Sequence, residues 1–430
     1  MSELVGFPLN GCDAFMLAMD SGMKRDGSSR NVCHLLVTLA PGADLSKCIE
    51  QLSLSPALNE VIRLRLSTSL LRTPRWIITL SATSRHSISS LESCVEELDL
   101  QRLILASTLD PKREAPFGVI ALPRFCSGPS LLFYWHHALC DAHGGEELVR
   151  RIVSSTHGTL SNLTPTTTPQ VPRHEAARRA QHTKRLIFKK SSPTIARLAR
   201  NTSQAPLHRF ARIAFTEEQT EKIDAGVRKL TGGMFPSALF LAATARAFSR
   251  TLPLGTSDDR PLFIPVPHDM RRTTKQPSPL SNQVSVAFFR LEPTQDNKLV
   301  DTTNDVIGQL QETIAEHHHH GMLDFLRFVR RLPSRLLWKV IEYPTAGHPA
   351  SFYFSDIGAS LSRLETACGE EVRYAAHYPP NLAPPGFTTV WSRYRGRIEV
   401  TLCYDQTSLS EQNLSAFIEN INNELLGAAA

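Results

Sequence analysis

A stretch rich in proline and threonine divides the chain, and it constrains the fold more than any other feature of the sequence. It runs from Thr164 to Pro172, and its three prolines remove backbone donors and prevent a helix from continuing. Of the 430 residues, about 160 precede this stretch and about 230 follow the linker or crossover to which it belongs, and each part has the size of a typical domain. We therefore predict an N-terminal subdomain at 1–160, a linker or crossover at 161–205 and a C-terminal subdomain at 206–430.

Both parts mix helical and strand patterns, which indicates an α/β or α+β architecture for each. In the first part, Cys33–Ala40 and Leu131–Trp135 are typical of strands, and a helix begins near Gly144. The second part predicts helices at 216–232, 236–250 and 304–316, strands at 261–266, 283–291 and 351–354, a hairpin at 387–404 and a capped C-terminal helix.

The net charge of +6 is concentrated in one segment. Residues 173–200 contain nine Lys or Arg and one acidic residue, Glu175, so this segment carries +8 and the rest of the chain −2. The surface as a whole is therefore not uniformly basic, and we predict no nucleic-acid partner.

The composition is that of an ordinary globular protein, with 41% hydrophobic and 20% charged residues and a mean hydropathy of −0.17. No apolar run is long enough to cross a bilayer, and the first 25 residues contain Glu3, Asp13 and Asp20, unlike a signal peptide. The eight cysteines lack the spacing of a zinc site, which favours free thiols. We predict a cytoplasmic protein with no integral membrane association and no metal.

The strongest chemical signal stands where the apolar run Leu131–Trp135 ends in His136 and His137, with Asp141 four residues further on. Adjacent residues of a strand point to opposite faces, so one histidine can enter the core and the other a cleft. An imidazole with a free acceptor nitrogen and a pKa near neutrality is suited to deprotonate a hydroxyl or amine that attacks an acyl donor.

The same pattern occurs a second time, at His319, His320 and Asp324. This copy belongs to a run of four histidines, 317–320, at the expected end of the helix at 304–316. Histidines at a helix C-terminus are compatible with the helix dipole and with solvent, so we interpret the run as a solvated helix end. Adventitious metal binding is the main alternative.

The first histidine motif resembles the His-His-x-x-x-Asp-Gly signature of the CoA-dependent acyltransferase superfamily. This superfamily includes chloramphenicol acetyltransferase, condensation domains, polyketide-associated acyltransferases and wax ester synthases. Five further segments resemble family segments and follow the family's order over nearly the whole chain: PLNGCDAF from Pro8, PVPHDMRR from Pro265, SNQVS from Ser281, FSDIG from Phe354 and TLCYD from Thr401.

The resemblance implies an α/β fold, an α+β two-layer sandwich, in which two chloramphenicol-acetyltransferase-like subdomains form a pseudo-dimer with a tunnel at their interface. It implies no permanently bound cofactor. The donor substrate would be acyl-CoA or the acylated phosphopantetheine of a carrier protein, and the acceptor a small alcohol or amine. The basic segment could meet the phosphates of coenzyme A or the acidic face of a carrier protein. We expect a monomer.

The resemblance also assigns roles to residues. His137 would be the general base, with His136 and Asp141 in the same catalytic motif, and Asp141 would pair with an arginine of the second half to hold the loop. The residues assigned to structural or tunnel positions are Arg271, Asn282, Ser285 and Ser355. Three positions depart from the family pattern: Ala142 and Ser281 replace glycines, and Asp356 replaces an asparagine.

The favoured function is O-acyl transfer from a thioester to a hydroxyl group, in lipid or natural-product biosynthesis, because the segments at Pro8 and Pro265 resemble those of wax ester synthases. A freestanding condensation enzyme that forms an amide is the alternative within this class. The three departures motivate a different class, an acyl-binding accessory protein that has lost turnover. A metal protein built on residues 317–320 is a third hypothesis.

Overall fold

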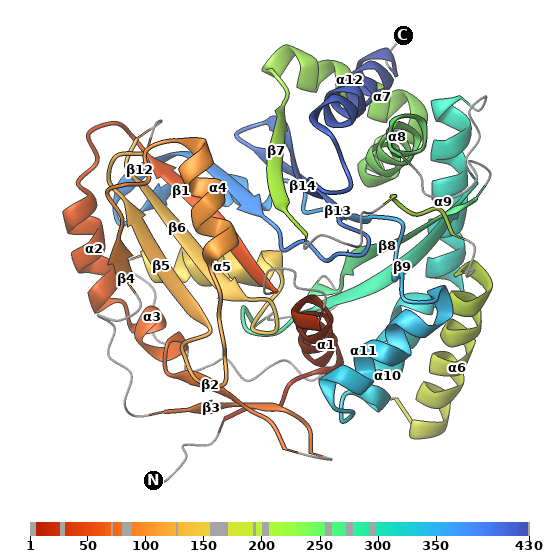
Figure 1. The fold of residues 1–430 in the computed structure, drawn as a ribbon, viewed down its shortest axis with the longest axis horizontal. Helices are drawn as coiled ribbons and strands as arrows, with labels where there is room; N and C mark the ends of the chain where they lie inside the picture. The colour runs from red at the N-terminus through yellow and green to blue at the C-terminus, as the bar shows by residue number, and fades with distance from the viewer. Residues whose placement is uncertain are drawn as a thin grey trace.

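The computed structural model places the chain in two lobes that meet along a central seam (Figure 1). It describes residues 6–25, 31–69, 72–79, 88–125, 128–154, 171–191, 195–199, 206–253, 260–271, 278–292 and 298–428. Most of the proline- and threonine-rich stretch, from Thr164 to Gln170, lies outside these residues. Within the described ranges, no helix is both long enough and apolar enough to cross a membrane.

The first lobe is built on a six-stranded sheet in the order β11, β12, β1, β6, β5, β4. Its strands are β1 (Val32–Leu39), β4 (Ile88–Ser90), β5 (Phe117–Leu122), β6 (Ser130–His136), β11 (Thr366–Ala367) and β12 (Glu370–Tyr378). Neighbouring strands are antiparallel, except that β4 and β5 are parallel. The lobe also contains α2 (Leu45–Leu54), α3 (Pro56–Val61), α4 (Glu97–Ala106), α5 (Ala142–Val153) and the pair β2 (Leu64–Ser67) and β3 (Arg75–Ile78).

Both faces of this sheet are covered, and every residue of β1 is buried. Leu35 and Val37 belong to one apolar cluster with residues of α2, α3 and α5. Leu36 points to the opposite face and packs with residues of α4 and of the second lobe, because side chains alternate along a strand. The apolar run that leads to His136 forms β6, in which only Tyr134 is incompletely buried.

Strand β12 completes the first sheet although it comes from far along the chain (Figure 1). It pairs with β1, so that His34 lies opposite Tyr378 and Leu39 opposite Val372. The range 206–430, predicted as the C-terminal subdomain, therefore contributes β11 and β12 to the sheet of the first lobe. The two lobes share the second part of the chain.

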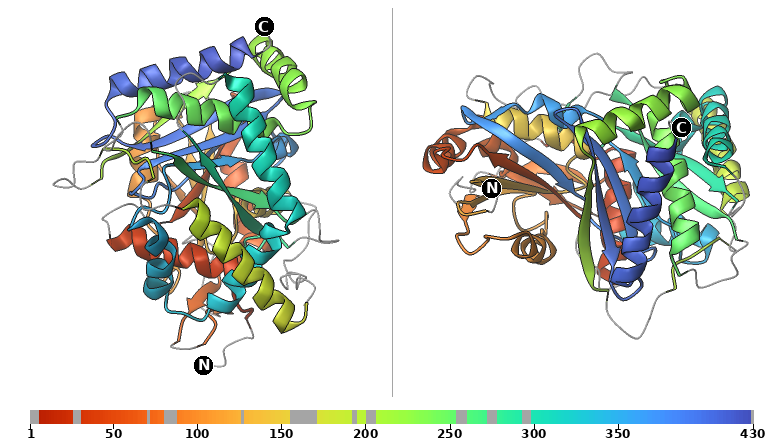
Figure 2. Two further views of the ribbon diagram at one scale, coloured as in Figure 1. Left: turned by 90° about the vertical axis from the view of Figure 1, so that its right-hand side faces the viewer. Right: turned by 90° about the horizontal axis from the view of Figure 1, so that it is seen from above.

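The second lobe contains a four-stranded sheet in the order β10, β13, β14, β7 and a separate two-stranded sheet, β8 with β9. The strands are β7 (His208–Ala214), β8 (Leu262–Asp269), β9 (Val284–Leu291), β10 (Tyr353–Asp356), β13 (Phe387–Tyr394) and β14 (Arg397–Asp405). The helices are α7 (Glu217–Thr231), α8 (Pro236–Thr251), α9 (Leu299–Ala315), α12 (Glu411–Gly427) and the 3-10 turns η3 (Tyr343–Thr345) and η4 (Ser360–Arg363). Figure 2 shows α12 beside α7 and α8 on the outside of this lobe.

The four remaining helices are α1 (Gly11–Arg25), α6 (Arg173–Lys190), α10 (His318–Val329) and α11 (Ser334–Glu342). Helix α1 lies at the seam, and α6 lies at the outer edge of the second lobe (Figure 1). Helix α1 packs against α10 and α11, and α6 packs against α10. Most of the basic segment is thus an ordered helix, whose buried face includes Ala176, Ala180 and Leu186.

The prediction that the histidine run is a solvated helix end is wrong. His317 stands before a new helix, and His318 is the first residue of α10. The His318 side chain is buried, and its ring lies 3.3 Å from the Thr183 hydroxyl of α6. The run therefore belongs to the contact between α6 and α10. No group of three or more described His, Cys, Asp or Glu side chains is arranged to hold a metal ion.

Candidate active site

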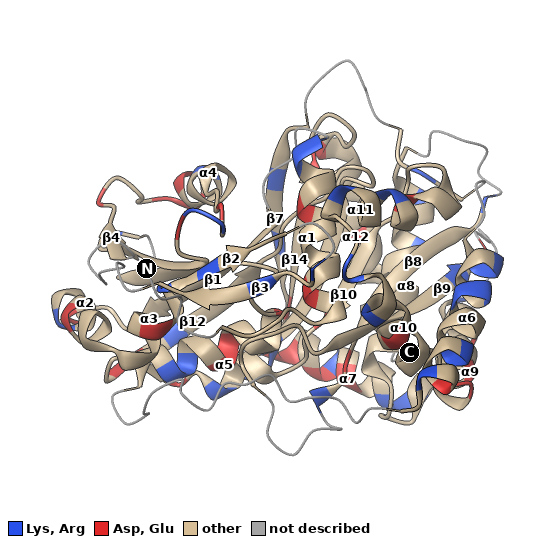
Figure 3. Ribbon diagram, turned by 90° about the horizontal axis from the view of Figure 1, so that it is seen from below, with Lys and Arg blue, Asp and Glu red and all other residues tan. Residues whose placement is uncertain are grey.

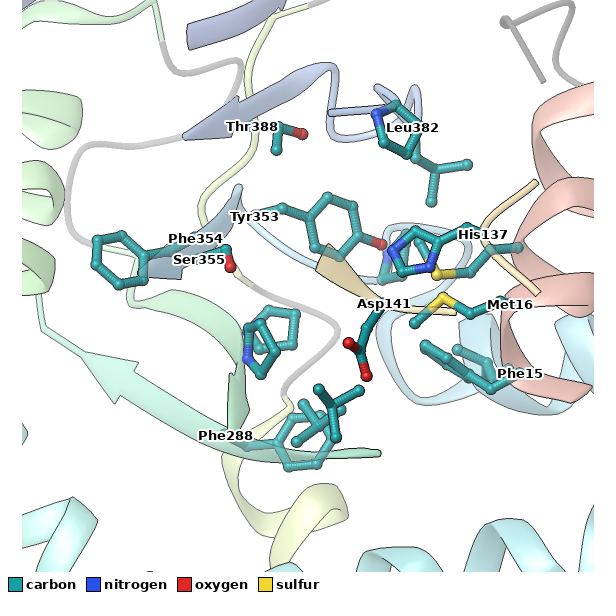
Figure 4. A pocket seen from close by; sticks show the side chains of 18 of the residues that line it. Phe15, Met16, His137, Asp141, Phe288, Tyr353, Phe354, Ser355, Leu382 and Thr388 are labelled. Carbon is teal, nitrogen blue, oxygen red and sulfur yellow. The ribbon is translucent and has the colours of Figure 1, made fainter. Parts of the chain in front are cut away.

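A cavity of about 570 Å³ lies at the seam and receives residues from both lobes (Figure 4). The first lobe contributes His137, His143 and His377, and the second contributes β9 and β10. Most of the remaining lining is apolar: Phe15, Met16, Met19 and Met23 of α1 face Val284, Val286 and Phe288 of β9. The cavity therefore suits an apolar substrate chain with a reacting group near a few polar side chains.

His137 follows directly after β6 and is the histidine of the adjacent pair that lines the cavity. Its backbone is fixed at both ends: its N–H donates to the Asn31 carbonyl over 2.9 Å, and its carbonyl accepts from Asn282 Nδ2 over 2.8 Å. Burial lowers the pKa of His137, and this effect outweighs the opposing influence of its own carbonyl and of Asp141. The imidazole is therefore neutral at pH 7 and able to accept a proton.

Asp141 and Arg271 form a buried ion pair across the seam, 2.7 Å apart. Asp141 also caps α5, because its Oδ1 accepts from the Gly144 N–H, while its Oδ2 accepts from the Gln283 N–H. Burial alone would raise the pKa of Asp141, but the Arg271 charge and these hydrogen bonds hold it below its ordinary value. Asp141 is thus a permanent anion that ties the histidine loop to β9 and to the chain after β8.

A second buried carboxylate, Asp13 of α1, holds Asn282 in place. The backbone N–H and Nδ2 of Asn282 both donate to Asp13 Oδ1, over 2.7 and 2.9 Å. Burial raises the pKa of Asp13 to about 6. The role of Asp13 was not predicted, although it stands in the PLNGCDAF segment. The signal that could have indicated it is an aspartate that stands between the apolar residues Cys12 and Ala14.

The other predicted residues divide between cavity and core. Ser355 lines the cavity. Ser285 is fully buried and donates to the His319 carbonyl over 2.6 Å, because alternation along β9 places Val284 and Val286 in the cavity instead. His136 is also fully buried; its Nε2 lies 3.8 Å from Asp20, and its Nδ1 accepts from the Ala138 N–H. His136 therefore occupies the core position expected for one histidine of the pair, and its place in the catalytic motif is inside the loop rather than at the cavity.

Two further polar features of the cavity were not predicted. His143 Nδ1 lies 3.5 Å from Glu146, and the other oxygen of Glu146 lies 2.8 Å from His377 Nε2. Burial opposes the charged form of His143, but Glu146, Asp141 and Asp269 prevail and raise its pKa. The hydroxyl of Tyr353 points toward His137 (Figure 4). His377 comes from β12, so no local sequence signal could place it here.

The chain resembles known proteins in its structure but not detectably in its sequence. The sequence matches no protein-family model and no curated protein. The structure of a trichothecene 15-O-acetyltransferase from Fusarium sporotrichioides is similar with a TM-score of 0.72 and 16% identity, over 96% of this chain and 94% of that one. The first condensation domain of the CDA synthetase has a TM-score of 0.68 and 12% identity, over 99% and 97%. This chain has the acyltransferase and condensation-domain fold.

Another structure with this fold is the wax ester synthase/diacylglycerol acyltransferase from Marinobacter aquaeolei, with a TM-score of 0.61 and 16% identity over 99% of this chain and 100% of that one. The two-lobed α/β architecture expected from the resemblance is therefore confirmed. Identities of this size establish the fold alone, so the function has to be argued from the site.

The three departures from the family pattern leave the acyltransferase and condensation-domain fold intact. Ala142 is the first residue of α5 and is not among the residues with positive φ, so alanine fits there without strain. Ser281 keeps a glycine-like backbone, with φ of 102°. Asp356 accepts hydrogen bonds from Ser237 Oγ and the Gly358 N–H, and burial raises its pKa.

Proposed function

We propose that the protein is an acyltransferase that moves an acyl group from a thioester to a hydroxyl acceptor, with His137 as the general base. The observation that carries the proposal is a neutral imidazole, held by its backbone, at an apolar cavity between two lobes. An imidazole in this state meets the requirement for a base at neutral pH.

The proposed reaction needs one base and one site for negative charge. An imidazole nitrogen of His137 takes the acceptor's hydroxyl proton while the oxygen attacks the thioester carbonyl carbon. The carbon–sulfur bond then breaks, and the departing thiolate takes the proton from the imidazolium, so atoms and charge balance. In the first turn of α5 the Gly144 N–H donates to Asp141. The N–H groups of Ala142 and His143 have no acceptor within their helix, and both residues line the cavity. We assign to these amides the stabilisation of the carbonyl oxygen.

Asp141 and Arg271 have a structural role in this proposal. Their ion pair joins the loop after β6 to the loop after β8, and no proton transfer is assigned to it. Ester formation is favoured over amide formation because the segments at Pro8 and Pro265 resemble wax ester synthases. The apolar lining of α1 and β9 supports a fatty acyl chain or an apolar acceptor. We place the reaction in the cytoplasm, since the described cysteines are free and buried.

The test compares two histidines that stand in the same local pattern. His137→Ala is expected to lower turnover about 10²- to 10⁴-fold with the melting temperature retained, because it removes the proposed base. His320→Ala, in the second copy of the pattern, is the matched control and is expected to leave turnover unchanged. Product formation is followed by mass spectrometry with acyl-CoA and acyl carrier protein donors and a panel of alcohols and amines.

Unchanged turnover in His137→Ala would contradict the proposal. The same measurement separates the alternatives: an amide product would replace ester formation, and the absence of any product from the wild-type protein would favour the accessory protein. A product that depends on His137 excludes the accessory protein.

A further inference from the structure

Two charged side chains face each other at the cavity without forming a hydrogen bond. His143 of α5 and Asp269 at the end of β8 both line the cavity, and His143 Nε2 lies 4.0 Å from Asp269 Oδ2. This separation is too long for a direct hydrogen bond. One oxygen atom can, however, lie at a hydrogen-bonding distance of about 2.8 Å from both atoms. The pair is therefore spaced for a polar group of a ligand that bridges it.

Each member of the pair is oriented by contacts of its other polar atom. His143 Nδ1 lies 3.5 Å from Glu146 Oε2, and Glu146 Oε1 lies 2.8 Å from His377 Nε2. Asp269 Oδ1 accepts from the backbone N–H and from Nη1 of Arg271, over 3.0 and 3.1 Å. Because these contacts engage His143 Nδ1 and Asp269 Oδ1, the atoms that face each other are His143 Nε2 and Asp269 Oδ2.

The facing atoms are one donor and one acceptor. Burial opposes the charged form of His143, but Glu146, Asp141 and Asp269 outweigh it and raise the pKa of His143. This favours the imidazolium, in which both ring nitrogens carry a proton, so Nε2 donates. The carboxylate oxygen of Asp269 accepts. A hydroxyl group accepts one hydrogen bond and donates another, and it can therefore satisfy both atoms at once.

Charged ligand groups fit this pair less well. An ammonium group would be repelled by the His143 imidazolium and offers no acceptor for its proton. A carboxylate or phosphate would be repelled by Asp269 and Glu146 and offers no proton to Asp269. The basic residues of α6 lie on an outer helix, apart from α5 (Figure 3), so they do not offset this repulsion. The group that matches the pair is an uncharged hydroxyl.

This hydroxyl is not the one that reacts. A hydroxyl carries a single proton. In the proposed reaction the reacting hydroxyl gives that proton to His137, so it cannot also donate to Asp269. The two histidines belong to the same site: burial opposes the charged form of His137 and of His143, and the charge of Asp141 favours it in both. A substrate that uses His137 and the pair at once therefore needs two hydroxyl groups.

We propose that His143 and Asp269 form a binding site for a second hydroxyl group of the acceptor, which is a diol or polyol with an apolar chain. The inference rests on the proposed function. The side chain of His143 then determines specificity, while His137 remains the base. A hydroxyl on the acyl chain of the donor has the same chemistry, so the experiment includes compounds that distinguish the two sources.

The test compares 1,2-octanediol and 1,3-octanediol with 1-octanol, which has the same chain length and one hydroxyl. Affinities for the full chain are measured by isothermal titration calorimetry without a donor. At least one diol is expected to bind about tenfold more tightly than 1-octanol, because hydrogen bonds to charged groups have an effect of that order. Methyl 3-hydroxyoctanoate and methyl octanoate are compared in the same way, and no preference is expected between them.

Two variants locate the preference. His143→Phe keeps an aromatic ring and removes both nitrogens, so it is expected to bind the diols no more tightly than 1-octanol. Thr388→Val is the matched control: Thr388 also lines the cavity, but its hydroxyl donates to Asn381 Oδ1 over 3.0 Å. This variant should keep the preference for the diols. The melting temperature of each variant shows whether it is folded.

The pH dependence of the wild type provides a measurement that needs no variant. In the described residues, the titratable or charged side chains around His143 and its two carboxylate neighbours are Asp141, Glu146, Asp269, Arg271, Asp356 and His377. When His143 loses one proton, the other is expected to stay on Nδ1 beside Glu146, so Nε2 no longer donates. The preference for the diols should therefore decline as pH rises through the raised pKa of His143.

The proposal is overturned if the wild type binds neither diol more tightly than 1-octanol, if His143→Phe keeps the preference, or if Thr388→Val loses it equally. A preference for methyl 3-hydroxyoctanoate without one for the diols also overturns it, because the hydroxyl would then belong to the acyl chain. None of these measurements requires turnover. Acyl transfer to 1-octanol that depends on His137, without a preference for the diols, would overturn this inference and leave the proposed function standing.

Discussion

At the scale of single residues, the site depends on a few buried polar groups that satisfy each other. Asp13 accepts from the Asn282 N–H and Asp141 from the Gln283 N–H, and Asn282 in turn donates to the His137 carbonyl. Ser281 lies beside this arrangement, and its N–H donates to the Leu139 carbonyl over 2.8 Å. Its φ of 102° is a conformation that favours glycine, so the loop contact is maintained against local strain.

Ser281→Gly is therefore expected to stabilise the protein by about 1 kcal/mol, because glycine adopts this φ without a steric cost. The free energy of unfolding is measured by denaturant titration. Ser281→Ala is the matched control: it removes the hydroxyl and keeps the Cβ, so it should give no gain. Equal stability of the glycine and alanine variants would show that the backbone at this position is not strained.

The residues of this site differ in how far the sequence could predict them. His137, Asp141 and Arg271 belong to segments that resemble the family, and the ion pair between the last two is present. Glu146 lies between His143, on the same helix, and His377, which is about 230 residues further along the chain. His377 reaches Glu146 only because its strand, β12, joins the first sheet. For Ser285 the sequence left a structural and a tunnel position open; the structure gives it a structural one, because the phase of alternation along β9 is set by packing and not by the local pattern.

At the scale of elements, α1 supplies part of the lining of the cavity at the seam and packs on α10 and α11. It packs closely on α11, where a Cβ built on Gly22 would lie 2.5 Å from the Trp338 ring. The rigid indole ring has no flexible end that could move aside. The closeness of these two helices therefore depends on the absence of a side chain at this position. Helices such as α7, α8 and α12 were predicted from pattern, but α1 and α11 were not, and the contact between them involves residues more than 300 positions apart.

Gly22→Ala is expected to destabilise the protein by about 1–3 kcal/mol, as overpacking does in a well-packed core. Gly308→Ala in α9 is the matched control, since a Cβ there meets open space, and it should be neutral or stabilising by up to about 1 kcal/mol. Thermal unfolding of the two variants provides the comparison. A Gly22→Ala variant as stable as Gly308→Ala would contradict close packing of α1 on α11.

At the scale of the whole molecule, the proline-rich stretch predicted two subdomains, and the two lobes are present. The prediction could not reveal that the second part of the chain supplies strands to both sheets. Strand β1 lies between β6 and β12, and all its residues are buried. Without β12, β1 would become a long apolar edge strand, which is a template for aggregation. Parallel or antiparallel pairing between distant segments leaves no local trace in the sequence.

Residues 1–160 expressed alone are therefore expected to aggregate. The same fragment with residues 366–378 attached through a flexible linker should be more soluble, because β11 and β12 would cover β1 again. The soluble fraction and the far-ultraviolet circular dichroism of both fragments are compared. A monomeric, cooperatively folded 1–160 fragment would contradict the importance of this strand.

The path of the chain through β10, β12 and β13 has a thermodynamic consequence. β10 and β13 lie side by side in the second sheet, while β12, between them in the chain, lies in the first. Because the chain passes from the second sheet to the first and back, unfolding of one sheet disrupts the other. We therefore expect the two lobes to unfold together, with one free energy of unfolding. A substitution in either lobe then shifts the same equilibrium, and a ligand bound at the seam stabilises the entire chain rather than one half of it.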